Sequence, residues 1–91
     1  MNTAQPLLSV LMPVYNERAT IAEILRRVRA VPLDLEVVVV DDGSTDGTRE
    51  ILTGLAGADP ALKLVFHEKN AGKGAAMRTA IAHASGSISL V

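Results

Sequence analysis

The chain has 91 residues, 48% of them hydrophobic, and a net charge of -1. This length allows one small domain and excludes a second. The balance of 9 basic and 10 acidic side chains argues against electrostatic binding to nucleic acid, so no nucleic-acid partner is expected. The lack of cysteine excludes disulfides, thiolate metal sites and cysteine catalysis, and it fits a reducing compartment.

The N-terminal region predicts neither a membrane span nor a secretory signal. The apolar run over residues 7–15 is shorter than the roughly 20 residues that cross a bilayer. Residues 1–6 carry no positive side chain, which a signal peptide would need. We therefore expect a cytoplasmic protein.

The first predicted elements are a strand and a helix. Residues 7–14 form an apolar run typical of a strand, and Pro13 indicates its end. Thr20 and Glu23 have the spacing of a capping box, which predicts the start of a helix, and Pro32 ends that helix. The apolar residues between these limits repeat with helical spacing, at Ile21, Ile24, Leu25 and Val28.

The second strand–helix pair starts from an uninterrupted apolar run. Residues 36–40 contain four consecutive valines, which predict a strand that is covered on both faces. A helix is predicted over residues 47–55, capped by Ser44, Thr45 or Asp46. Its inward side chains are expected to be Ile51, Leu52 and Leu55. Breaker residues predict a loop over residues 54–60.

A third strand is predicted over residues 62–66, and a third helix begins near residues 72–74. Its inward face is expected to comprise Ala76, Ala80, Ile81 and Ala84, and Gly86 closes it. Residues 88–91 begin a further strand. The order β-α-β-α-β-α-β predicts an α/β fold with a doubly wound parallel sheet. Ligands of such sheets bind beyond the carboxyl ends of the strands, so function is expected in the loops that follow them.

Polar residues gather in the first two of these loops. Tyr15, the only tyrosine, either packs half-buried or stacks on a base. Asp41 and Asp42 either end a strand and cap a helix, or one of them binds a ligand. Because adjacent carboxylates repel and one suffices for a cap, we expect Asp42 to accept hydrogen bonds from a ligand such as the N–H edge of a nucleobase.

The third loop leads into a helix through Gly72, Lys73 and Gly74. This segment is either a flexible turn with a solvated lysine or an anion site, because free N–H groups and the helix dipole favour phosphate. Several further basic side chains on the helices have no evident partner and are predicted to be solvated: Arg18, Arg49, Arg78 and His83.

Three motifs occur in order, each in a strand–loop–helix setting: PVYNE at residues 13–17, VDDGSTD at residues 40–46 and NAGKGAA at residues 70–76. Together they resemble the N-terminal motifs of family 2 glycosyltransferases, and most closely those of polyprenyl-phosphate sugar synthases of the dolichol-phosphate mannosyltransferase type. The resemblance implies the N-terminal half of a GT-A fold with a Rossmann-like parallel sheet. It also implies binding of a UDP- or GDP-sugar and sugar transfer to an acceptor such as a polyprenyl phosphate.

The resemblance also assigns roles to residues of this chain. Pro13 and Tyr15 would frame the nucleobase, and Glu17 would contact the nucleoside. Asp42 would hydrogen-bond the edge of the base. Lys73 would approach the diphosphate. These roles agree with the position of each residue in the predicted loops.

One family feature is absent from the sequence. Such enzymes place an Asp-x-Asp motif directly after the fourth strand, where Mg²⁺ or Mn²⁺ neutralises the diphosphate. The chain ends at Val91, inside the predicted strand. We therefore expect residues 1–91 to be the donor-binding part of a transferase, cut before its metal site. This part would contain no metal ligand and no catalytic residue, and it would be inactive alone. The complete enzyme could then meet a lipid phosphate at the cytoplasmic face of a membrane.

Two further hypotheses remain open. The chain could be a stand-alone flavodoxin- or receiver-like binding module, in which the acidic pair at residues 41–42 binds a metal or accepts phosphate. In addition, an uncovered apolar strand at residues 88–91 would recruit partners, so we expect a homo-oligomer formed through it.

Overall fold

The structure is a computed structural model that describes residues 6–90; residues 1–5 and Val91, the last residue of the predicted final strand, lie outside the described residues. Strands and helices alternate in the predicted order. They are β1 (Leu8–Val14), α1 (Ile21–Arg29), β2 (Leu35–Asp42), α2 (Thr48–Ala58), β3 (Leu62–His67), α3 (Lys73–His83) and β4 (Ser87–Leu90).

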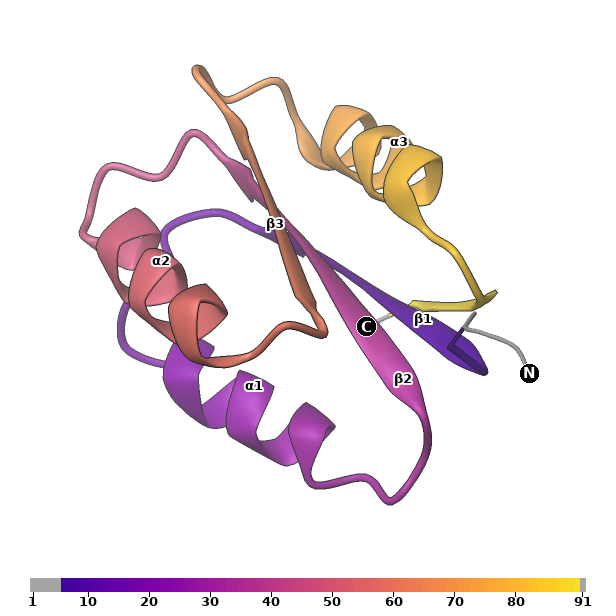
Figure 1. Cartoon of the computed structure of the whole chain (residues 1–91). Helices are drawn as coiled ribbons and strands as arrows, with labels where there is room; N and C mark the ends of the chain where they lie inside the picture. The colour runs from indigo at the N-terminus through magenta and orange to yellow at the C-terminus, as the bar shows by residue number, and fades with distance from the viewer. Residues whose placement is uncertain (1–5, 91) are drawn as a thin grey trace.

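The described strands form one parallel sheet in the order β3-β2-β1-β4. The chain moves outward from β1 to β3 and then crosses back to place β4 on the other side of β1. As a result α1 and α2 cover one face of the sheet and α3 covers the other (Figure 1). The prediction of a doubly wound parallel sheet is confirmed. Within residues 6–90, no helix has the length and apolar character needed to cross a membrane.

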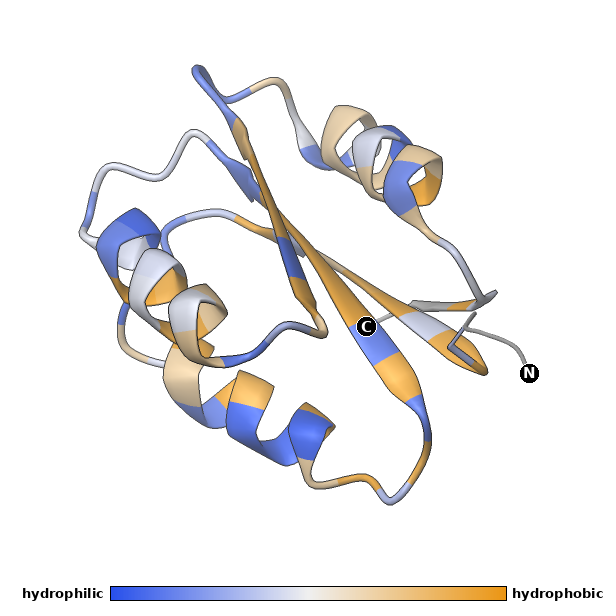
Figure 2. Ribbon diagram, viewed as in Figure 1, coloured by the Kyte–Doolittle hydropathy of each residue, from blue (hydrophilic) through white to orange (hydrophobic). Residues whose placement is uncertain are grey.

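Long aliphatic side chains fill the face under α1 and α2. The inward residues of the two helices, Ile21, Leu25 and Leu52, pack against alternate residues of the strands. Burial along β2 is continuous, as the run of valines predicted, because helices cover both faces of this central strand. Figure 2 shows the hydrophobic colour concentrated along the central strands and the polar colour on the outer sides of α1 and α2.

The face under α3 has a thinner apolar layer. Ala76 and Ala80 are fully buried there against Leu11, Val38 and Val40. The prediction that Ile81 also points inward is wrong, because its side chain is 47% exposed. Residues four apart share a helix face, whereas each further residue is turned by about 100°. The next residue after Ala80 therefore points away from the sheet.

Some predictions about where helices begin and end differ from the structure. The predicted start of α1 is confirmed, because Thr20 is its N-cap, but the capping-box hydrogen bonds do not form. The Thr20 hydroxyl instead bonds the Glu17 carboxylate at 2.9 Å, and Glu23 pairs with Arg26 and Arg27. The predicted loop over residues 54–60 is wrong up to Ala58, because α2 continues through two glycines. An added Cβ at either glycine would meet no neighbour, which places both on the open side of the helix.

Gly86 does not close α3, which ends at His83. A Cβ at Gly86 would lie 2.7 Å from the Pro6 carbonyl oxygen and 3.2 Å from the Leu8 backbone. The glycine is therefore needed for the close approach of the chain to β1 just before β4 begins.

Candidate functional site

The carboxyl ends of β1, β2 and β3 lead into three loops, here called the first loop (residues 15–20), the second loop (residues 43–47) and the third loop (residues 68–72). A cavity of about 320 Å³ lies between the first and third loops. All of the predicted site residues line it: Pro13, Tyr15, Glu17, Asp42 and Lys73. The parallel sheet thus brings together residues that are up to 60 positions apart in the sequence.

Side chains of the second loop and of α2 hold the first loop in place. The Asn16 N–H donates to Ser44 Oγ at 2.8 Å, and Asn16 Oδ1 accepts the Thr45 N–H at 2.8 Å. The Glu17 N–H donates to Thr48 Oγ1 at 3.0 Å. Asn16 has a φ of 52°, a left-handed conformation that asparagine tolerates better than most residues. The sequence interpretation gave Asn16 no role, although an asparagine between a strand and the helix that follows it is typical of a turn of this kind.

Asp42, at the end of β2, holds the third loop. Its Oδ1 accepts the Ala71 N–H at 2.9 Å and a bond from His67 Nδ1 at 2.8 Å, and its Oδ2 accepts the Gly72 N–H at 2.9 Å. Burial raises the pKa of Asp42, but the hydrogen bonds from Ala71, His67 and Gly72 outweigh this effect and hold the pKa below its ordinary value. Asp42 is therefore a carboxylate that accepts hydrogen bonds and donates none.

These bonds limit what Asp42 can offer a ligand. A carboxylate oxygen accepts about two hydrogen bonds. Oδ1 already has two donors from the protein, whereas Oδ2 has one. A ligand N–H would therefore bond to Oδ2.

Some backbone N–H groups at the start of α3 already have a partner within the protein. The N–H groups of Ala71 and Gly72 point to Asp42, so they are not free for a phosphate as the sequence suggested. The first bond within the helix runs from the Ala76 N–H to the Gly72 carbonyl at 3.0 Å. The N–H groups of residues 73–75 precede that bond and have no acceptor within the helix. Lys73 is exposed and lines the cavity, so it is the cationic group placed to meet an anion there.

Gly43 allows the second and third loops to meet. Its φ is 79°, and a Cβ at this position would lie 2.6 Å from the Asn70 nitrogen and 2.7 Å from the Lys69 carbonyl carbon. No other residue type could occupy this position without moving the loops apart.

The two adjacent carboxylates face opposite sides of the sheet. Successive side chains alternate along a strand, so Asp41 lies on the α1/α2 side and Asp42 on the α3 side. This separation removes the repulsion that the sequence suggested. It also disfavours the flavodoxin- or receiver-like alternative, which needs both carboxylates at one site.

Asp41 is fully buried and has a structural partner. Its Oδ2 accepts the Ser44 N–H at 3.1 Å and Arg49 Nε at 2.9 Å, while its Oδ1 has no hydrogen-bond partner among residues 6–90. Arg49 also donates to the His67 carbonyl at 2.6 Å and lies 4.5 Å from the ring centre of Phe66. The prediction that Arg49 is solvated is therefore wrong, because the sequence alone does not show which strand end lies beside α2.

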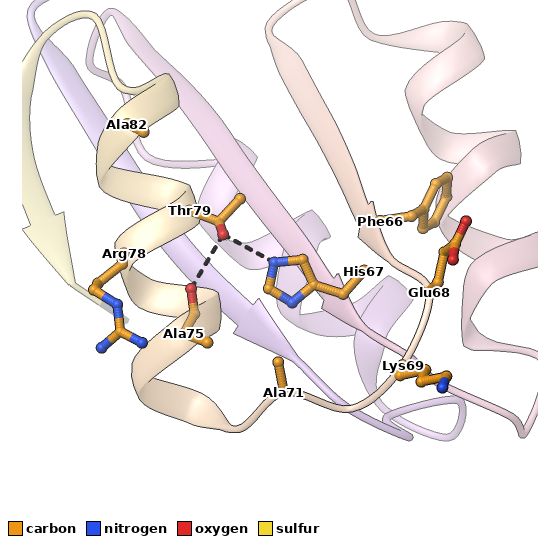
Figure 3. Close-up of a pocket in the computed structure, with 9 residues that line it drawn as sticks. All are labelled: Phe66, His67, Glu68, Lys69, Ala71, Ala75, Arg78, Thr79 and Ala82. Atoms are coloured by element: carbon orange, nitrogen blue, oxygen red, sulfur yellow. Dashed lines mark hydrogen bonds between the residues drawn. The ribbon is translucent and has the colours of Figure 1, made fainter.

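A larger and more open hollow of about 700 Å³ lies beside the first cavity, between β3 and α3 (Figure 3). His67 lines this hollow and contacts Asp42 of the cavity, so it stands between the two. Arg78 also lines the hollow and is exposed, as are Arg18 and His83, which confirms the prediction that these three side chains are solvated.

The side chains of residues 6–90 do not form a metal site. They contain no group of three or more histidine, aspartate or glutamate side chains placed to hold a metal ion. The described residues therefore do not fit a divalent cation, and we assign no metal-dependent step to them.

Sequence comparison relates the chain to sugar transferases. The chain matches the family described as "Glycosyl transferase family 2" over residues 9–91. It is 45% identical over 76 residues to the undecaprenyl-phosphate 4-deoxy-4-formamido-L-arabinose transferase of Pseudomonas aeruginosa. The matched region covers 78% of this chain and 22% of that protein. It is 37% identical over 89 residues to a dolichyl-phosphate beta-glucosyltransferase of Trichomonas vaginalis, which covers 88% of this chain and 26% of that protein.

Structure comparison leads to the same group of proteins. A mannosyltransferase from Pyrobaculum calidifontis, in complex with GDP-Man and Mn²⁺, superimposes with a TM-score of 0.79 and 39% identity, covering 90% of this chain and 25% of that one. S. aureus TarS 1–349, in complex with UDP, superimposes with a TM-score of 0.84 and 33% identity. The superposition covers 93% of this chain and 26% of the TarS chain. The chain thus spans about a quarter of the length of these relatives.

Proposed function

The chain belongs to glycosyl transferase family 2, and we propose that the cavity between its first and third loops binds the nucleotide of a UDP- or GDP-sugar. The resemblance drawn from the three motifs is confirmed, as is the GT-A type of parallel sheet. One observation carries the proposal: the five side chains chosen from three separate motifs line a single cavity.

Each residue has a proposed role in that cavity. Tyr15 is 45% exposed, which leaves part of its ring available to a base, and Pro13 lies on the same wall. Asp42 Oδ2 would accept an N–H from the edge of the base, and Glu17 would contact the nucleoside. Lys73 would contact the diphosphate, an interaction worth about 1.5–3 kcal/mol for a charged hydrogen bond.

We propose that residues 1–91 serve as the nucleotide-sugar-binding part of a transferase whose acceptor is a lipid phosphate. The names of the Pseudomonas and Trichomonas relatives, which are transferases acting on undecaprenyl and dolichyl phosphate, support this acceptor class. The catalytic residues and a Mg²⁺ or Mn²⁺ site would then lie on other residues of the complete enzyme. The Mn²⁺ in the mannosyltransferase complex supports a divalent cation of that kind.

Two expectations from the sequence remain proposals. The first is a cytoplasmic location, with the lipid acceptor met at the membrane face. The second is self-association through β4, which pairs with β1 along one side and is the last strand of the sheet on that side. Light scattering at increasing concentration should show a dimer or larger species, and a monomer throughout would contradict it.

Calorimetric titration of the chain with UDP, GDP and uridine tests the proposed site. UDP or GDP should bind weakly but saturably. Lys73→Ala should weaken UDP binding about tenfold and leave uridine binding unchanged, because only the diphosphate is contacted by this lysine. Lys69→Ala is the matched control, since Lys69 is an exposed lysine of the third loop that does not line the cavity. No binding of either nucleotide, or equal losses for UDP and uridine, would reject the assignment.

A further inference from the structure

His67, the last residue of β3, lies between two elements of the site. Its Nδ1 is 2.8 Å from Asp42 Oδ1, and its Nε2 is 2.8 Å from Thr79 Oγ1 on α3. Thr79 Oγ1 also bonds the Ala75 carbonyl at 3.1 Å. Figure 3 shows the His67 ring directed toward Thr79 across the hollow between β3 and α3. Both ring nitrogens therefore have a partner, and the ring is held at two points.

The hydrogen-bond partner of Nδ1 determines whether this nitrogen carries a hydrogen. Asp42 is ionised and can only accept, so His67 Nδ1 must carry a hydrogen and donate it. The Thr79 hydroxyl has a single hydrogen: it either donates this hydrogen to the Ala75 carbonyl and accepts Nε2–H, or donates it to an unprotonated Nε2 in place of the Ala75 carbonyl. The donor on Nδ1 does not depend on which of these applies.

This donor occupies one oxygen of the cavity carboxylate. Asp42 Oδ1 accepts two hydrogen bonds, from His67 Nδ1–H and from the Ala71 N–H. Asp42 Oδ2 accepts one, from the Gly72 N–H. Without the His67 donor, the carboxylate could rotate and exchange its two oxygens. Asp42 would then no longer hold Ala71 and Gly72 in one arrangement.

We propose that His67 is a positioning residue for nucleotide binding: its Nδ1–H fixes the Asp42 carboxylate so that the third loop stays in place and Oδ2 alone is open to the ligand. His67 does not line the nucleotide cavity itself, so it acts through Asp42. The statement about the ligand rests on the proposed nucleotide-binding function, whereas the statement about the loop does not.

Two substitutions separate this role from simple space filling. The amide nitrogen of asparagine is attached to Cγ, as Nδ1 is, so His67→Asn keeps a donor toward Asp42 and loses the bond to Thr79. The amide of glutamine lies one bond further out, near the position of Nε2, so His67→Gln keeps a partner for Thr79 and loses the donor to Asp42. If His67 only filled the space between β3 and α3, the larger glutamine would be the better tolerated of the two.

The first measurement needs no nucleotide. Amide hydrogen exchange at Ala71 and Gly72 should be about tenfold or more faster in His67→Gln than in the wild type, and within about threefold of the wild type in His67→Asn. His83→Gln is the control, because the ring of this other histidine is exposed and its one hydrogen bond within residues 6–90 is to the Thr79 carbonyl of its own helix. Faster exchange in His67→Asn than in His67→Gln, or equal exchange in both, would overturn the proposal. Should His67→Gln fail to fold, His67→Asn decides alone: slow exchange supports the role, and fast exchange overturns it.

The second measurement is UDP and GDP affinity for the same variants. His67→Gln should lose about tenfold in affinity, and His67→Asn and His83→Gln should lose less than about threefold. If the wild type binds neither nucleotide, the proposed function fails while amide exchange still decides the role of His67. If the wild type binds but both His67 variants bind equally well, the positioning role is overturned and the nucleotide site stands.

Discussion

The two faces of the sheet are held to their helices in different ways. On the α1/α2 face, long side chains such as Leu25 and Leu52 are buried against the strands. On the α3 face, the buried helix residues are Ala76 and Ala80, which remove far less apolar surface from water. The first face is held mainly by apolar burial, with the Asp41–Arg49 pair at its edge, and the second must gain a larger part of its stability from polar interactions.

Those interactions are hydrogen bonds to two buried carboxylates, one near each end of β2. Asp42, at the carboxyl end, accepts the N–H groups of the loop that enters α3. Glu36, at the amino end, accepts the Ser85 N–H of the segment that leaves α3 at 2.6 Å and pairs with Lys63 Nζ at 2.9 Å. Hydrogen bonds thus hold α3 at both of its ends, and those at the carboxyl end of β2 also shape the cavity between the first and third loops.

The largest effect is expected on the apolar face. Leu52→Ala should lower the free energy of unfolding by about 2–5 kcal/mol, because Leu52 is fully buried and its loss leaves a cavity. Urea denaturation followed by circular dichroism measures this. A loss below about 1 kcal/mol would show that apolar burial does not dominate on that face. Ala56→Gly, which removes only a methyl group from the same helix, is not expected to reach this range.

The opposite change should damage the other face. Ala80→Leu should cost about 1–3 kcal/mol, because α3 lies too close to the sheet for a larger side chain. It should also speed amide exchange at Gly72, since moving α3 strains the bond to Asp42. Ala82→Leu, at an exposed position of the same helix, should be nearly neutral. Equal effects of the two substitutions would mean that the alanine contact is not tight.

Acid should release α3 before α1 and α2. Burial raises the pKa of Asp42 and of Glu36, but their hydrogen bonds outweigh burial and hold both pKa values below the ordinary ones. Carboxyls with a lowered pKa in the folded state add stability above their unfolded pKa, near 4, and lose it as the pH falls through the folded pKa. Amide exchange in α3 should therefore rise as the pH falls below about 4, and more than in α1. Arg26 and Arg27 also lower the pKa of Glu23 on α1, to about 2, but this carboxylate is exposed and its ion pairs add little stability.

The double variant Asp42→Asn with Glu36→Gln sharpens the acid experiment. It should be less stable at neutral pH and should lose less stability on acidification, because neither side chain titrates any longer. If the wild type and this variant show the same pH dependence, the carboxylates do not provide the stabilisation proposed for this face.

The smallest effect is expected at Ile81. Its side chain is 47% exposed, so Ile81→Ala should change the free energy of unfolding by no more than about 0.5 kcal/mol. Thermal unfolding of Ile81→Ala and Leu52→Ala under the same conditions compares the losses in stability of the two variants. A loss of more than about 2 kcal/mol would place Ile81 in the core, as its sequence pattern suggested.

Patterns with strong local signals were predicted well. Four consecutive valines indicated a strand covered on both sides, and strand–helix alternation indicated the parallel topology. Weak signals failed where tertiary context decided the outcome. Glycines that suggested a loop lie within α2, and the capping residues Thr20 and Glu23 found partners elsewhere.

The site shows the same division. Five of the residues that line the cavity could be chosen from the sequence, because parallel strands place the loops that follow them at one edge. Their partners could not be chosen, because hydrogen bonds between residues 8 to 28 positions apart in different elements leave no periodic trace. His67, Asn16 and Arg49 were missed for this reason.

The sequence by itself thus determined the order of strands and helices, the family, and the side chains that the cavity presents. Burial patterns and short motifs encode these properties locally. Only the tertiary structure decided that Asp41 pairs with Arg49 of α2, and that Asp42 holds the third loop before any ligand arrives. The reason is geometric: the direction of a side chain follows from strand alternation, but its partner depends on which loops the folded sheet brings within hydrogen-bonding distance.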